Sequence, residues 1–384
     1  MMDAKKILTN KCFCPLPWTG LMYNFDGTIK NCIRSSGPIG NIKDNNIHDI
    51  LLGADNVKTQ EDMLAQKPGS RCSPCYDLEV GKNSFDIISD RIFYIKELRT
   101  VSPDTYKLNN HELHSIDIRW SNLCNSACVY CGPEFSSKWA SELNKFLPTP
   151  SEQQLQEFKE YIFKHVEQFK HVYLAGGEPL LMRENLELLE QLQQKNPDVH
   201  LRINTNLSKT NTNIFEKICE FKNVHWIIRV ESLGSQFDYI RYGNNWLDFR
   251  SNLETIQKLG HKVTFNMLHC ILNFLSLWHC IHYLQKMGFK DNSFIIGPLE
   301  SPLYLNSRHL HEIHVQWIIN KIDYEISHGA EYLYLDSLIN LKTYLEQPFE
   351  RDLETTFNRL KELDKRRGID SRKVFPELYL FTGY

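Results

Sequence analysis

Three cysteines stand at the spacing CxxxCxxC, as Cys124, Cys128 and Cys131 in the run that extends from Trp120 to Gly132. Three thiolates hold only three irons of a cubane [4Fe–4S] cluster, whereas a closed electron-carrying cluster uses four cysteines. The fourth iron would then be open to chelate a small molecule. The same residues also permit a zinc site completed by a distant histidine or cysteine, because tetrahedral zinc centres use this donor set.

Strand-like residues precede both this triplet and a glycine turn. The stretch 114–120 leads straight into the cysteines, and the stretch 172–175 ends in Gly176-Gly177-Glu178. This combination resembles the radical S-adenosylmethionine (radical SAM) superfamily. The resemblance implies that the open iron binds SAM, that Glu178 binds the methionine amino group, and that the glycines allow close backbone approach. Reduction of the sulfonium would release a 5′-deoxyadenosyl radical, and this chemistry belongs to the cofactor.

The chain after residue 114 alternates between two kinds of pattern. Apolar, β-branched and aromatic residues predict six strands, each followed by a helix-like segment, at 115–120, 171–175, 199–204, 224–231, 262–268 and 292–297. Ser151 and Gln154 form a capping-box pattern before a helix predicted at 152–169. Such alternation predicts an α/β fold with a parallel sheet and functional groups at the C-terminal strand ends. The resemblance implies a partial (β/α)6 TIM-like barrel, and a doubly wound open sheet is the alternative.

Two nucleoside contacts follow from the resemblance and from the predicted strand ends. Tyr130, between the second and third cysteines, matches the superfamily position whose backbone meets the adenine. Asn204 or Asn206 closes the third strand, where polar side chains emerge at the barrel mouth, and is predicted to line the nucleoside pocket.

The fourth strand departs from the superfamily pattern. It ends in Glu231-Ser232, where relatives commonly carry Ser-x-Asp-Gly. Glu231 or Ser232 is predicted to bind the ribose, because a carboxylate or hydroxyl can hydrogen-bond a diol. Further on, Arg241 is predicted to fork onto the carboxylate of the methionine moiety. No residue is assigned a catalytic role toward the substrate.

The N-terminal third carries a second set of cysteines and a hairpin signal, Asp26-Gly27, which suits a type I′ turn. With its CPxPW-type opening, this region resembles the Twitch or SPASM auxiliary module of radical SAM enzymes, although here it precedes the barrel. The resemblance implies a second, closed [4Fe–4S] cluster held by Cys14, Cys32, Cys72 and Cys75. From spacing alone, Cys12 could exchange roles with Cys14. A structural zinc ribbon is the alternative for this module.

Composition bounds the class of protein. The chain has 384 residues and a net charge of −3, which gives no overall drive toward nucleic acid or an anionic membrane. No apolar run approaches the roughly 18 residues needed to span a bilayer, and the N-terminus lacks the apolar core of a secretory signal. Eleven cysteines without such a leader favour a reducing compartment and metal binding over disulfides. A cytoplasmic location and no membrane partner are therefore predicted.

The three regions are predicted as an auxiliary module with its connecting helix at 1–110, a radical SAM barrel at 111–307, and a helical extension at 308–384. The resemblance implies an oxidoreductase that uses SAM, two [4Fe–4S] clusters and an external one-electron donor of the flavodoxin or ferredoxin type. Its substrate would be a peptide or a small metabolite, changed by net oxidation. The alternatives are a redox-neutral epimerase or rearrangement enzyme, and a non-catalytic iron–sulfur or zinc scaffold.

Overall fold

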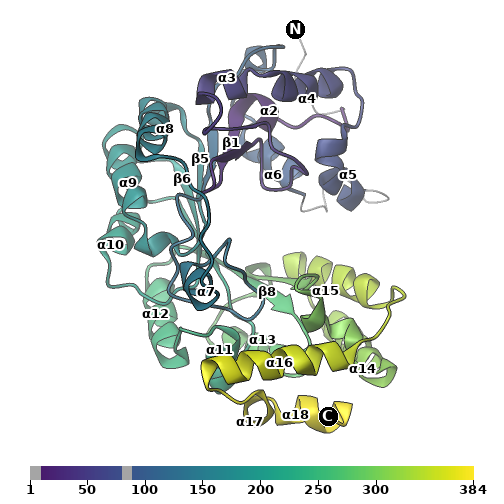
Figure 1. Cartoon of the computed structure of the whole chain (residues 1–384). Helices are drawn as coiled ribbons and strands as arrows, with labels where there is room; N and C mark the ends of the chain where they lie inside the picture. Colours follow the sequence, from purple (N-terminus) through teal and green to yellow (C-terminus); the bar gives the residue numbers. More distant parts are fainter. Residues whose placement is uncertain (1–9, 80–88) are drawn as a thin grey trace. The chain divides into compact units, whose positions relative to one another are not determined.

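The structure is a computed structural model that describes residues 10–79 and 89–384. The chain divides into two compact units. Unit 1 comprises residues 1–123, 146–204 and 211–225, and unit 2 comprises residues 124–145, 205–210 and 226–384. Figure 1 colours both along the sequence. The three-region division predicted from the sequence, with boundaries after residues 110 and 307, stays a prediction.

Unit 1 is built on a mixed sheet in the order β3-β2-β1-β4-β5-β6. The strands are β1 Gly20–Tyr23, β2 Thr28–Lys30, β3 Gly40–Asn41, β4 Ser115–Ile118, β5 His171–Leu174 and β6 His200–Thr205. The first three form an antiparallel meander, whereas β1 pairs in parallel with β4, and β4, β5 and β6 continue in parallel. The predicted hairpin at Asp26-Gly27 joins β1 to β2, and Gly27 has a φ of 89° that few other residues would adopt.

Helices flank this sheet. Three of them, α8 Glu152–Lys164, α9 Arg183–Lys195 and α10 Asn213–Cys219, follow strands β4 to β6 and lie together in Figure 1. The ring of Phe158 on α8 stacks on Tyr23 of β1, with centroids 4.4 Å apart. The N-terminal region adds α2 Leu16–Thr19, α3 Ile47–Leu51, α4 Ala54–Leu64, α5 Ser73–Glu79 and α6 Asp90–Glu97.

Unit 2 contains the remaining strands. β7 Val224–Ile228 begins in unit 1 and ends in unit 2, and β8 Lys262–His269 pairs in parallel with β9 Phe294–Pro298. The helices are α7 Ser137–Glu142, α11 Gly234–Ile240, α12 Trp246–Lys258, α13 Ser276–Lys286, α14 Glu312–Ser327, α15 Tyr332–Leu345, α16 Leu353–Arg367, α17 Ser371–Val374 and α18 Pro376–Thr382. Gly368 ends α16 in the left-handed conformation with a φ of 64°, which glycine adopts at low cost.

The predicted fold class is confirmed, because parallel strands alternate with helices as in a partial barrel. Both reciprocal bonds of the predicted capping box between Ser151 and Gln154 are present. That helix is shorter than predicted: α8 ends at Lys164, and a separate 3-10 turn at Val166–Gln168 leads to Phe169 in extended conformation. In the part of the chain that the structure describes, no helix is long and apolar enough to cross a bilayer.

Candidate functional site

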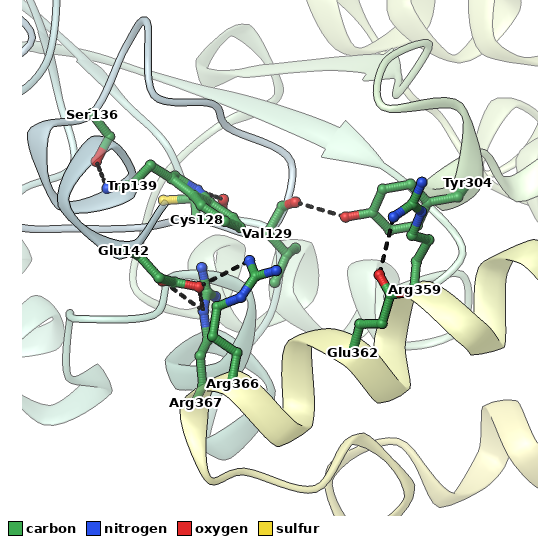
Figure 2. A network of polar contacts seen from close by, with 10 residues as sticks. All are labelled: Cys128, Val129, Ser136, Trp139, Glu142, Tyr304, Arg359, Glu362, Arg366 and Arg367. Carbon is green, nitrogen blue, oxygen red and sulfur yellow. Dashed lines mark hydrogen bonds and ion pairs between the residues drawn. The ribbon is translucent and has the colours of Figure 1, made fainter. Parts of the chain in front are cut away.

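The segment Cys124–Gly132, called the cysteine loop below, is held by bonds from its neighbours in unit 2. The backbone N–H groups of Ala127 and Val129 donate to the carbonyls of Tyr242 and Ile240, at 2.7 and 2.9 Å. The indole Nε1 of Trp139 donates to the Cys128 carbonyl at 2.8 Å, as Figure 2 shows. Because the segment is neither helix nor strand, these contacts from α7 and from the end of α11 fix its path.

The three thiols of the loop influence one another. Burial raises the pKa of Cys131 to about 12, and the nearby Cys128 and Cys124 thiols add to the rise. Burial also raises the pKa of Cys128, which is 7% exposed. Thiols in such a setting stay protonated until a metal displaces the protons, since only thiolates bind metal. The donor set therefore fits an iron–sulfur cluster that takes one thiolate per iron.

Within residues 10–79 and 89–384, no three His, Cys, Asp or Glu side chains form a group that could hold a single metal ion. Cubane ligands bind separate irons, so they do not have to meet around one ion.

Polar side chains surround Cys124. The Asn206 amide donates to Ser126 Oγ at 2.9 Å and to Asn125 Oδ1 at 3.1 Å, and lies 3.8 Å from Cys124 Sγ. Of the two asparagines predicted for the nucleoside pocket, Asn206 lies beside the cysteine loop within unit 2. Asn204 is half-buried at the end of β6 in unit 1.

Two predicted cofactor contacts, Glu231 and Arg241, form a buried ion pair with each other. Arg241 Nε donates to Glu231 Oε2 at 2.8 Å, and Nη2 donates to Oε1 at 2.9 Å. The side chains are 4% and 0% exposed. Arg241 Nη1 also lies 3.9 Å from Cys128 Sγ, and its guanidinium lies 5.6 Å from the ring centre of Tyr130. Unit 2 thus brings Glu231 and Arg241 beside Cys128 and Tyr130 of the cysteine loop.

Ser232, the other candidate for the ribose contact, already has protein partners. It is 1% exposed, and its Oγ lies 2.9 Å from Gln236 Oε1 and 3.0 Å from Ser276 Oγ. A ribose contact would have to share this hydroxyl with Gln236 and Ser276.

In unit 1, the Gly-Gly-Glu turn packs backbone to backbone against the residues just before Cys124. The N–H groups of Gly177 and Glu178 donate to the carbonyls of Ser121 and Leu123, at 3.3 and 2.8 Å. A Cβ atom on Gly177 would lie only 2.2 Å from the Leu123 oxygen, and Gly176 has a φ of 111°. Both glycines are therefore required by geometry. Glu178 is 1% exposed and caps a short 3-10 turn by accepting from Leu180 N at 3.1 Å.

A pair that the sequence reasoning missed lies on β4 and just beyond it. Arg119 Nη2 donates to Asp117 Oδ2 at 3.1 Å, and the two side chains are 11% and 8% exposed. Among the described residues, Asp117 Oδ1 and Arg119 Nε have no hydrogen-bond partner. Burial raises the pKa of Asp117, although Arg119 opposes that effect. The signal was present, because polar residues alternate with apolar ones along 115–120 and so share one face of a strand.

The four predicted ligands of the auxiliary module, Cys14, Cys32, Cys72 and Cys75, line one cavity in unit 1. Burial raises the pKa of Cys14, and the other three thiols raise it further. Arg34, Arg71, Arg91 and Asp90 also line this cavity, and each arginine is paired with a carboxylate. Cys12 instead directs its Sγ toward the Gln66 carbonyl at 3.5 Å. The geometry therefore groups Cys14, not Cys12, with the other three cysteines.

Known proteins give the following comparisons. The chain matches no curated protein sequence. A structure of native anSMEcpe with bound AdoMet and Kp18Cys peptide is 14% identical with a TM-score of 0.42, covering 57% of this chain and 62% of that one. Streptococcus suis SuiB bound to precursor peptide SuiA is 12% identical with a TM-score of 0.43, covering 72% and 60%. This chain thus spans about three fifths of the length of these structures, and TM-scores below 0.5 carry no functional conclusion.

The family comparison falls on the region that contains the cysteine loop. Residues 118–296 match the model described as the Radical SAM superfamily. This range includes the cysteine loop, the Gly-Gly-Glu turn, and both members of the Arg241–Glu231 pair. Residues 118–296 are therefore similar to the radical SAM domain, the type of domain that uses S-adenosylmethionine and a [4Fe–4S] cluster.

Proposed function

We propose that this protein is an oxidoreductase of the radical SAM class that acts on a peptide or a small metabolite. The observation that carries the proposal is the cysteine loop: three cysteines at CxxxCxxC spacing inside the matched domain, with a buried Arg241–Glu231 pair beside them. When bound, the cluster and SAM supply a 5′-deoxyadenosyl radical after one-electron reduction by an external donor of the flavodoxin or ferredoxin type.

In this proposal, different residues of the chain bind different parts of the cluster and of SAM. Cys124, Cys128 and Cys131 bind three irons. Glu178 accepts from the methionine ammonium, next to glycines whose lack of side chains lets the turn pack on the backbone of the residues before Cys124. The backbone at Tyr130 meets the adenine, Asn204 or Asn206 lines the nucleoside pocket, and Glu231 or Ser232 contacts the ribose.

Arg241 is proposed to bind both Glu231 and the cofactor. Two of its nitrogens are committed to Glu231, so only Nη1, which lies near Cys128 Sγ, remains for a cofactor carboxylate. A bidentate pair also fixes the orientation of both side chains more strictly than a single bond does. We therefore expect the pair to position the cysteine loop as well as the cofactor.

The auxiliary module is proposed to hold a second [4Fe–4S] cluster through Cys14, Cys32, Cys72 and Cys75. Four thiolates leave no open iron, so this cluster would not bind substrate. When bound, it supplies an acceptor for one electron. Its convergent, arginine-flanked thiols in one cavity support the assignment.

Asp117 and Arg119 in unit 1 are proposed to contact the substrate. A buried carboxylate oxygen and a buried guanidinium N–H without partners are costly, and native proteins seldom leave them so without a ligand or a functional reason. Both atoms belong to one strand face in the matched domain or directly before it. A polar group of the substrate would satisfy them.

Net oxidation means that the substrate loses one hydrogen atom to the deoxyadenosyl radical, then one proton and one electron. Mass spectrometry of the product after anaerobic incubation with SAM, a reductant and candidate substrates tests this. A product lighter by two hydrogens supports the proposal. An unchanged mass would indicate epimerisation or rearrangement, and a gain of one methyl group would contradict radical hydrogen abstraction as the main reaction.

A further inference from the structure

The last residue of α16 lies outside the matched domain, yet it reaches the residues that hold the cysteine loop. Arg367 is 1% exposed in its side chain, and its Nε lies 3.2 Å from a carboxylate oxygen of Glu142 at the end of α7. Its guanidinium carbon lies 4.5 Å from the ring centre of Trp139 and 4.4 Å from that of Tyr242. Figure 2 shows Arg367, Glu142 and Trp139 in this arrangement.

Both aromatic residues beside Arg367 are bonded to the cysteine loop. Trp139 donates its indole N–H to the Cys128 carbonyl at 2.8 Å. The Tyr242 carbonyl accepts the N–H of Ala127 at 2.7 Å. The guanidinium therefore packs against two side chains whose residues fix consecutive positions of the loop, one of them the predicted iron ligand Cys128.

A second contact connects α16 to the same loop. Thr356 Oγ1 donates to the Tyr304 carbonyl at 2.8 Å. The Tyr304 hydroxyl in turn donates to the Val129 carbonyl at 3.4 Å, as Figure 2 shows. The helix thus supports residues 127, 128 and 129 through three intermediates: Trp139, Tyr242 and Tyr304.

The helix dipole alone does not account for Arg367. Cations are favoured in the last turn of a helix at the surface, and the neighbouring Arg366 fits that description with 39% exposure. Arg367 is instead almost fully removed from water, and among the described residues its Nη1 and Nη2 have no hydrogen-bond partner. Desolvating a guanidinium costs free energy that cation–π contacts and the Glu142 pair must offset.

The positive charge of Arg367 lies close to the cysteine loop. Its guanidinium packs on the ring of Trp139, and the indole N–H of Trp139 is bonded to the Cys128 carbonyl. A positive charge near an iron–sulfur cluster favours its reduced, more negative form, since net charge is one of the factors that set cluster potentials.

We propose that Arg367 is a positioning residue for the cysteine loop: it packs against Trp139 and Tyr242, and its charge raises the reduction potential of the cluster bound there. This inference rests on the proposed function only for the presence of the cluster. It extends that function to the C-terminal helix, which lies beyond the matched residues 118–296.

The test compares Arg367→Met with Arg366→Met in the full-length, anaerobically reconstituted protein. Arg366 is the matched control, because it also pairs with Glu142, at 3.4 Å, but is far more exposed. Redox titration followed by electron paramagnetic resonance measures the potential of the cluster, and a chelator measures the rate of iron release. We expect Arg367→Met to lower the potential and release iron several-fold faster, while Arg366→Met behaves as wild type.

Two further variants keep the test decisive if Arg367→Met does not fold. Arg367→Lys keeps the charge but not the planar stacking group, so the potential should stay near wild type while iron is released faster. Glu142→Gln removes the carboxylate that orients Arg367 and should also speed iron release. Wild-type rates of iron release in both of these variants would overturn the proposal. Wild-type SAM cleavage is assayed in parallel, so a protein that holds a cluster but cleaves no SAM would refute the proposed function alone.

Discussion

Arg241 and Glu231 bind each other through two hydrogen bonds of 2.8 and 2.9 Å, in a setting where neither side chain meets appreciable solvent. Removing one partner would leave a buried charge uncompensated, at a cost of about 3–5 kcal/mol. We predict that Arg241→Met and Glu231→Gln each lower the stability of the protein by about that amount. The double variant Arg241→Met/Glu231→Gln should recover much of the loss. An additive loss in the double variant, measured by urea denaturation, would contradict a coupled pair.

Gly177 is predicted to tolerate no side chain, because a Cβ atom there would lie 2.2 Å from the Leu123 oxygen. Gly177→Ala should push the Gly-Gly-Glu turn away from the residues before Cys124 and weaken SAM binding at least ten-fold. Gly297→Ala on β9 is the control, since a Cβ there meets nothing within 4 Å. Equal SAM affinity in the two variants, titrated at equal iron content, would show that the close approach at Gly177 does not matter for the cofactor.

Glu178 is predicted to bind the methionine ammonium without being needed for cluster assembly. Glu178→Gln keeps an oxygen that can still accept from Leu180 N but removes the negative charge. Charge-assisted hydrogen bonds contribute about 1.5–3 kcal/mol, so SAM should bind roughly ten- to a hundred-fold more weakly, the equivalent of that loss. The measurement is a SAM titration of a variant with full iron content, and an unchanged affinity would rule out the assignment.

The auxiliary module is predicted to hold a closed cluster and to use Cys14 in preference to Cys12. Reconstituted wild-type protein should contain about eight irons in two [4Fe–4S] clusters. Cys14→Ala should lose about half of them, whereas Cys12→Ala, whose thiol faces the Gln66 carbonyl, should keep the full content. Stoichiometric zinc in protein purified anaerobically without added zinc would instead establish the zinc ribbon.

Asp117 is predicted to act on the substrate and not on the cofactor. Asp117→Asn keeps the shape of the side chain and its bond from Arg119 but removes the charge. Conversion of substrate should fall by at least ten-fold, while SAM cleavage in the absence of substrate stays near the wild-type rate. A parallel fall in both activities would place Asp117 in the structural support of the cofactor site.

Local sequence patterns were enough to predict the strands and helices. Apolar residues that recur with a period of 2 or 3.6, and capping residues, act over only a few positions. The capping box at Ser151 is an example, and it stands where predicted. The cysteine spacing likewise identified a loop that falls inside the matched domain.

Contacts between segments that are distant in the sequence could not be predicted from these local patterns. The helix dipole is a sufficient local explanation for both Arg366 and Arg367, and only the tertiary packing of α16 against α7 distinguishes the buried cation from the exposed one. Similarly, Glu231 and Arg241 were each predicted to face a ligand, but side chains from a strand end and a following helix can satisfy each other first. The sequence could not indicate which partner they would choose.

The central claim is that this protein cleaves SAM at a cluster held by the cysteine loop. The most direct measurement is the formation of 5′-deoxyadenosine and methionine by anaerobically reconstituted, reduced protein, quantified by liquid chromatography and mass spectrometry. We predict equal amounts of both products from the wild-type protein. The variant with Cys124, Cys128 and Cys131 all changed to Ala should form neither product, while it retains the iron of the auxiliary module. A wild-type protein with full iron content that forms no 5′-deoxyadenosine would contradict the account.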